Sequence, residues 1–182
     1  MDSFQSVNTS SLENSFCQQM NQAENSVCFK CYSDRFSKMR PSLEKRLIEN
    51  SQVLSSRLLE PKEIPFFNAR YVRFNSFGEI INEIHYLNLL RIAKANPHTK
   101  FGLWTKRSNI VMMHSKAKNI KYIYSAPSVN VFKVSKTKLN WFDKVFVVEK
   151  KDNPKINCKG KCIDCLLCYT DNDTKFIYEK IK

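Results

Sequence analysis

Short β-rich segments alternate with helical segments over residues 71–182, and this alternation limits the fold more than any other feature. Tyr71, Val72 and Phe74 begin the series in a segment that Asn75, Ser76 and Gly78 interrupt. Further strands are expected over residues 100–106, 120–128, 144–154 and 174–182. Helices are expected over residues 41–59, 81–97 and 108–118. Such alternation favours parallel strands joined by right-handed crossovers.

The fold class expected is therefore α/β, with a mostly parallel sheet or a partial β/α barrel in a single domain. The chain has 182 residues, 42% of them hydrophobic, and only three glycines, which suits one packed core and not a disordered chain. Residues 1–16 are rich in Ser and Asn and form either a loose arm or a short edge strand. Residues 17–182 would form the α/β metal-binding domain.

The start of the chain has no basic, then apolar, signal segment, and no apolar stretch approaches the length of a membrane span. We expect a cytoplasmic protein without membrane contact. In a reducing cytoplasm, clustered thiols serve as metal ligands or redox groups more often than as disulfides, and seven cysteines cannot all pair. Cysteine-bound metal is the first expectation.

Four of the seven cysteines fall within eleven residues near the end of the chain, at Cys158, Cys162, Cys165 and Cys168. Zinc sites hold sulfurs about 3.8 Å apart and usually use two short cysteine pairs separated by a longer loop. A compact single-loop set is closer to iron–sulfur proteins, although the order of spacings is not that of ferredoxins. Zinc remains an alternative, bound by these four or by two of them with Cys28 and Cys31.

Cys17, Cys28 and Cys31 form an earlier set of three. Three thiolates would leave one iron of a [4Fe–4S] cluster open to solvent, substrate or a small ligand, which would suit catalysis. Alternatively, cysteines from both ends of the chain converge on one cluster and others stay spare in the core. The spacing does not decide between one centre and two.

Polar residues follow the expected strands at their carboxyl ends, where parallel α/β folds collect their chemistry. Ser76, Gly78, Glu79 and Lys106 are the candidate cofactor-binding residues. Glu79 is either a general base or a carboxylate in the first turn of a helix. Lys106 would hold an anionic group unless it is only a solvated neighbour. No residue is assigned a catalytic role.

The formal net charge of +13 raises nucleic acid as a partner, because clustered lysines displace counterions from phosphates. The basic residues are mostly scattered. The best local candidate is residues 132–144, which combine Lys133, Lys136, Lys138 and Lys144 with Phe132 and Trp141. The alternative function is accordingly a zinc-stabilised nucleic-acid-binding protein without catalysis.

Several segments in order, "CFKCY", "RFNSFGEI", "FGLWTKR", "YSAPS", "VFVVEKKDNP" and "CKGKCIDCLLCY", resemble the phage gene-product-88 domain family. The resemblance spans nearly the whole chain. It implies a bacteriophage origin, the host cytoplasm and cysteine-bound metal, but no defined reaction or substrate.

The resemblance carries over all seven cysteines together with Tyr32. Glu79 stands where relatives commonly have a shorter Asp, and the Pro-Gly that often follows the first cysteine is missing after Cys17. The early Cys-Tyr motif ahead of β/α units is also similar to radical S-adenosylmethionine enzymes, although the usual C-x3-C-x2-C spacing and a glycine-rich loop are absent. S-adenosylmethionine is therefore a second expected cofactor.

Taken together, the sequence predicts a phage iron–sulfur protein with a [4Fe–4S] cluster in a redox, catalytic or structural role. Whether it is an enzyme stays open.

Overall fold

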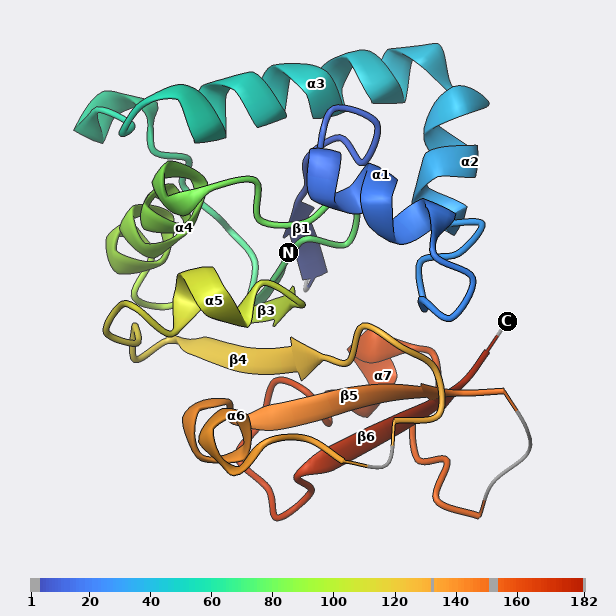
Figure 1. Ribbon diagram of the computed structural model, residues 1–182. Coiled ribbons are helices and arrows are strands. Elements are labelled where there is room, and N and C mark those ends of the chain that lie inside the picture. Colours follow the sequence, from blue (N-terminus) through green and yellow to red (C-terminus); the bar gives the residue numbers. More distant parts are fainter. Residues whose placement is uncertain (1–3, 132, 151–153, 182) are drawn as a thin grey trace.

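The computed structural model describes residues 4–131, 133–150 and 154–181 (Figure 1). Its centre is a six-stranded sheet in which every neighbouring pair of strands is parallel. The strands are β1 (Phe4–Val7), β2 (Tyr71–Phe74), β3 (Lys100–Thr105), β4 (Ile120–Ser125), β5 (Lys144–Glu149) and β6 (Phe176–Lys180).

The strands lie in the sheet in the same order as in the chain, from β1 at one edge to β6 at the other. In a β/α barrel the strands lie side by side in the order of the chain, whereas in a doubly wound sheet the strand order reverses partway across the sheet. The predicted α/β class with a parallel sheet is confirmed, and the strand order is that of an open partial barrel.

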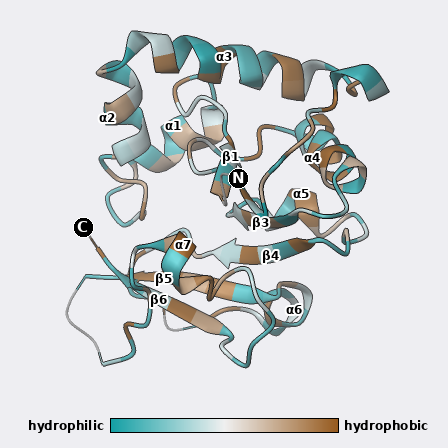
Figure 2. Cartoon of the chain, turned by 180° about the vertical axis from the view of Figure 1, so that it is seen from behind, coloured by the Kyte–Doolittle hydropathy of each residue, from teal (hydrophilic) through white to brown (hydrophobic). Residues whose placement is uncertain are grey.

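The helices are α1 (Ser15–Gln22), α2 (Tyr32–Lys38), α3 (Pro41–Ser56), α4 (Glu83–Ala95), α5 (Ser108–Val111), α6 (Lys136–Trp141) and α7 (Cys162–Cys165), with a short 3-10 turn at Pro61–Glu63. Helix α3 packs on α4, and α4 and α5 lie against the sheet (Figure 1). Helix α3 alternates hydrophobic and hydrophilic residues along its length, as an outer helix should (Figure 2).

The two faces of the sheet bury different residues because side chains alternate along each strand. On the helix-covered face, residues such as Val72, Phe74, Phe101 and Leu103 belong to the main apolar core. On the other face, a smaller cluster contains Tyr71, Trp104, Ile123 and Tyr169. Because Tyr169 belongs to the loop between β5 and β6, this loop covers the second face.

Most elements expected from hydrophobic periodicity are present, but the helix expected over residues 108–118 is a single turn at Ser108–Val111, and residues 151–153 of the strand expected over 144–154 lie outside the described residues. Residues 4–7 form the edge strand that is one of the two alternatives for the N-terminal segment.

The helix expected over residues 81–97 is formed, but the side that it buries is not the side predicted from the spacing of its aliphatic residues. His85 and Asn88 are fully buried in α4, whereas Ile84, Leu87 and Leu90 are only partly so. Asn88 bonds to the backbone at the end of α3, which explains its burial.

Within the described residues, the helices are all too short or too polar to cross a membrane.

Candidate metal centres

The carboxyl edge of the sheet carries both sets of cysteines. Cys17, Cys28 and Cys31, hereafter the trio, lie in the segment after β1. Cys158, Cys162, Cys165 and Cys168, the quartet, lie between β5 and β6. Because all six strands are parallel, the ends of β1 and β5 lie at the same edge, and Figure 1 shows α1 and α7 on this side.

The trio comes from one helix and one tight loop. Cys17 is in α1, and Cys31 immediately precedes α2. Lys30 adopts a left-handed conformation with φ of 53°, which turns the chain between Cys28 and Cys31. The backbone N–H groups of these two cysteines donate to Ser26 Oγ (2.9 Å) and Asn21 Oδ1 (2.8 Å). The loop is therefore fixed locally before any ligand binds.

The trio loop also rests on the ends of two strands. Val27 N–H donates to the Pro127 carbonyl (2.9 Å), and Ser26 forms an isolated bridge with Ser128 in the loop after β4. On the other side, the Tyr32 hydroxyl donates to the Ser76 carbonyl (2.7 Å) after β2. The loop thus spans the carboxyl ends of β2 to β4.

Helix α1 is held against the same edge by two contacts. Asn14 caps the helix by accepting from Phe16 N–H, and its amide donates to the Glu79 carbonyl (2.9 Å). The Arg107 guanidinium lies over the Phe16 ring at 4.9 Å and donates to the carbonyl of Ile80. Arg107 therefore positions α1 and with it Cys17.

Glu79 is buried and does not lie in the first turn of a helix, because α4 begins four residues later. Its Oε1 accepts from the Thr105 hydroxyl and from its neighbour Ile80 N–H, and its Oε2 accepts from Lys106 N–H, each at 2.8 Å. The helix-dipole alternative for Glu79 is therefore wrong. The carboxylate joins the loop after β2 to the end of β3 and positions Lys106.

Lys106 lies where the charges of the trio meet. Burial lowers the pKa of its ammonium group, but the negative charges of Cys28, Glu79, Cys17 and Cys31 outweigh burial and raise the pKa overall. Lys106 is therefore protonated at neutral pH. Lys106 is therefore close enough to each cysteine of the trio to feel its charge when the thiol ionises.

Cys17 is the trio member most affected by its surroundings. Burial raises the pKa of its thiol strongly, and the negative charge of Glu79 adds to the increase. Burial likewise raises the pKa of Cys31. Both groups are neutral thiols at pH 7 when no metal is bound, and a metal would displace their protons.

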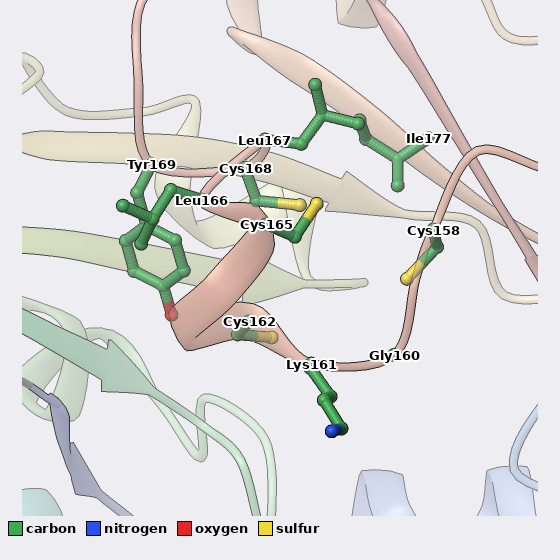
Figure 3. Close-up of a pocket in the computed structure, with 10 residues that line it drawn as sticks. All are labelled: Cys158, Gly160, Lys161, Cys162, Cys165, Leu166, Leu167, Cys168, Tyr169 and Ile177. Carbon is green, nitrogen blue, oxygen red and sulfur yellow. The ribbon is translucent and has the colours of Figure 1, made fainter.

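The four cysteines of the quartet line a small hollow that is partly open to solvent. Figure 3 shows Cys158 on one side of this hollow and the other three cysteines facing it, Cys162 below and Cys165 and Cys168 above, with the Cys165 sulfur turned upward. Leu166, Leu167 and Ile177 supply the apolar remainder of the lining. Burial raises the pKa of the Cys168 thiol to about 12, and the charges of Cys162 and Cys158 add to it.

Backbone hydrogen bonds fix the quartet loop to the last strand. Cys158 N–H donates to the Tyr178 carbonyl of β6 (3.0 Å). Helix α7 is a single turn, and Leu166 ends it in a left-handed conformation with φ of 50°. This reversal brings Cys168 back beside Cys162 and Cys165.

Tyr169 anchors the quartet loop on the sheet. Its ring contacts Phe4, Tyr71 and Trp104, and its side chain is only 1% exposed. Gly102 makes room for it, because a Cβ atom there would lie 2.7 Å from both Tyr169 Cε1 and Trp104 Cζ3. The glycine in β3 therefore permits the close approach of the loop.

Across residues 4–131, 133–150 and 154–181, no three Cys, His, Asp or Glu side chains are grouped as they would be around one metal ion. The zinc alternative that pairs Cys28 and Cys31 with Cys162 and Cys165 is not formed. A [4Fe–4S] cluster requires a wider arrangement, because each thiolate binds a different iron. The four cysteines of the quartet line one common hollow.

The remaining predicted residues have structural contacts. Gly78 has φ of 74° and faces Thr9, whose Oγ1 would lie 2.3 Å from a Cβ atom, so only glycine fits there. In the basic segment, Lys144 is buried and donates to Asn172 and Thr174, and Trp141 packs on Tyr122. Lys133 and Lys136 are exposed, and Phe132 lies outside the described residues.

Sequence reasoning missed Arg73 and Tyr169. Arg73 points to the face that carries the quartet loop, where its guanidinium lies 4.2 Å from the Trp104 ring, and its charge acts on both Cys168 and Tyr32. Two signals were available: a charged residue inside the apolar strand "YVRF", and a glycine inside "KFGLWT" that marks a close contact.

Comparison of the chain with protein-family models, with curated proteins and with solved structures gave no match.

Proposed function

We propose that this protein is an iron–sulfur protein that binds a [4Fe–4S] cluster through the trio, with one iron left without a protein ligand. The observation that carries the proposal is that the segment bearing Cys17, Cys28 and Cys31 is held at the carboxyl edge of the sheet by the bonds from Val27 to Pro127 and from Tyr32 to Ser76, next to Lys106. In parallel α/β folds this edge is where ligands bind and reactions occur.

The charges of the site suit an anionic cluster. Three thiolates and the bridging sulfides carry net negative charge, and the protonated Lys106 offsets part of it. Glu79 holds the Lys106 backbone in place through Oε2. The trio loop that carries Cys28 and Cys31 is fixed on Pro127 and Ser76.

An open iron supports an enzymatic role. The resemblance to radical S-adenosylmethionine enzymes and the sequential parallel sheet favour S-adenosylmethionine as the ligand of that iron. The reduced cluster would supply one electron, which splits a carbon–sulfur bond of S-adenosylmethionine into methionine and a 5′-deoxyadenosyl radical. The resemblance to the phage family supports a bacteriophage origin and action in the host cytoplasm.

The test is anaerobic purification followed by iron, sulfide and zinc analysis, with electron paramagnetic resonance of the dithionite-reduced protein. S-adenosylmethionine is expected to change the spectrum of the native protein. The change should be lost in Cys28→Ser/Cys31→Ser and kept in Cys162→Ser/Cys165→Ser, the matched control with the same C-x2-C spacing.

A colourless protein with stoichiometric zinc would contradict the cluster. A spectrum that S-adenosylmethionine leaves unchanged would remove this ligand but not the cluster.

The alternative is a zinc-stabilised nucleic-acid-binding protein without catalysis. Its support is the net charge of +13 and the exposed Lys133 and Lys136 beside α6. Salt-dependent retention of single-stranded or duplex DNA by the zinc-loaded protein, lost in Lys133→Ala/Lys136→Ala, would favour it.

A further inference from the structure

The quartet is a built site and not only a set of nearby cysteines. All four cysteines line one hollow (Figure 3), and the loop is fixed by the hydrogen bond of Cys158 to β6 and by the packing of Tyr169 on Gly102. The trio is fixed on different strands, namely the ends of β2 and β4. The two sets therefore form separately.

Two buried donors beside the quartet have no partner within the described part of the chain. The first is the Tyr169 hydroxyl, and the second is Arg73 Nε. Buried donors are nearly always satisfied, so each such atom in a folded protein requires an explanation. Both side chains interact electrostatically with Cys168, and Tyr169 also interacts with Cys162.

Both groups keep their protons under ordinary conditions. The Tyr169 side chain is only 1% exposed, and its phenolic O–H is a hydrogen-bond donor. A guanidinium is always charged. Thiolates and sulfides are acceptors, and hydrogen bonds to the sulfurs are one of the means by which proteins set the potential of an iron–sulfur cluster.

We propose that the quartet binds a second [4Fe–4S] cluster, with one thiolate on each iron and with Tyr169 and Arg73 as donors to its sulfurs. Such a centre has no open iron, so its chemistry is the gain and loss of one electron. The charge of Arg73 acts on Cys168 and also on Tyr32, the neighbour of Cys31. This inference adds a centre to the proposed function and does not depend on the trio.

The first test is iron and sulfide content after anaerobic reconstitution with ferrous iron, sulfide and dithiothreitol. The native protein should hold about eight of each, since each [4Fe–4S] cluster contains four. Cys162→Ser/Cys165→Ser and Cys28→Ser/Cys31→Ser should each hold about four, and the combined variant close to none. Circular dichroism and gel filtration check that each variant is folded.

The outcomes separate the two proposals. Unchanged iron in Cys162→Ser/Cys165→Ser, or one zinc at the quartet in place of iron, would overturn the second cluster. Unchanged iron in Cys28→Ser/Cys31→Ser would overturn the trio cluster. If the quartet variant does not fold, the iron retained by the trio variant decides: about four supports the second cluster, and none overturns it.

The donors are tested by redox titration with dithionite as the one-electron reductant, in the Cys28→Ser/Cys31→Ser background so that only the quartet responds. Tyr169→Phe should keep the iron and shift the midpoint potential to more negative values, because a donor to the cluster is lost. Tyr71→Phe is the matched control, since its ring packs on Tyr169, and should leave the potential unchanged. An unshifted potential in Tyr169→Phe would overturn the donor assignment.

Discussion

The helix-covered face of the sheet and its cysteine-bearing side are built in different ways. The first buries a continuous apolar core between strands and helices α3 to α5. The second consists of loops that bond to strand ends, with buried lysine, arginine and glutamate among seven thiols. The comparison shows that the helix-covered face can stabilise the fold without a ligand, whereas the cysteine-bearing side brings charged side chains and thiols together. Four measurements test this difference between the two sides.

Leu89→Ala tests the helix-covered face. Leu89 is fully buried in α4, and its truncation should lower the free energy of unfolding by about 3 kcal/mol. Urea denaturation should give the same loss with and without iron. Leu90→Ala, on the partly buried side of the same helix, should cost about 1 kcal/mol. If the stability lost in Leu89→Ala differed between the iron-loaded and the iron-free protein, the helix-covered face would not be independent of the cysteine-bearing side.

His85 gives the same face a pH dependence. Burial lowers the pKa of its imidazole to about 4, while the unfolded chain has the ordinary value of about 6.5. Between these values the unfolded chain binds the proton and the folded chain does not. Stability should therefore fall by up to about 3 kcal/mol as the pH drops from 6.5 to 4.

The check is urea denaturation at several pH values for the native protein and for His85→Asn, whose side-chain oxygen can replace Nδ1 as acceptor for Ile81 N–H. The variant should show a flatter profile in this range. Identical slopes would assign the pH dependence to other groups.

Gly102→Ala tests the attachment of the quartet loop. The new Cβ would collide with Tyr169 and Trp104, and overpacking of this kind should cost about 2 kcal/mol. Because Tyr169 must move, the quartet should also lose iron, which metal analysis would detect. Leu89→Ala is the control, with comparable destabilisation but unchanged iron. Full iron in Gly102→Ala would separate the Tyr169 anchor from metal binding.

Glu79→Gln should have the smallest effect. The –NH2 group of the glutamine would face one of the donors from which the carboxylate now accepts a hydrogen bond. Two donors facing each other should cost about 1.5 kcal/mol of stability. Since Glu79 holds the backbone of Lys106, iron at the trio should fall while iron at the quartet stays. Glu83→Gln, at the exposed start of α4 where the carboxylate lies 3.0 Å from His114 Nε2, should leave the iron content unchanged. Equal iron in both variants would limit Glu79 to a structural role.

The sequence predicts the sheet well because its strands and long helices have clear hydrophobic periods. Helix α1 has no buried residue and depends on the Asn14 cap, so periodicity does not reveal it. The role of Glu79 was missed because its partners Thr105 and Lys106 lie more than twenty residues away. The thiols themselves were predicted from residue type and spacing. Their division between strands β2 to β4 and strand β6 depends on long-range contacts that spacing does not encode.

The hydrogen bond from Val27 N–H to the Pro127 carbonyl determines when the trio loop can take its final position during synthesis. The trio loop leaves the ribosome one hundred residues before the carbonyl on which it rests. At typical elongation rates, this separation means about 5–20 s during which its thiols have no fixed surroundings. Cofactor loading should therefore follow completion of β4, and the cell must keep these thiols reduced until then.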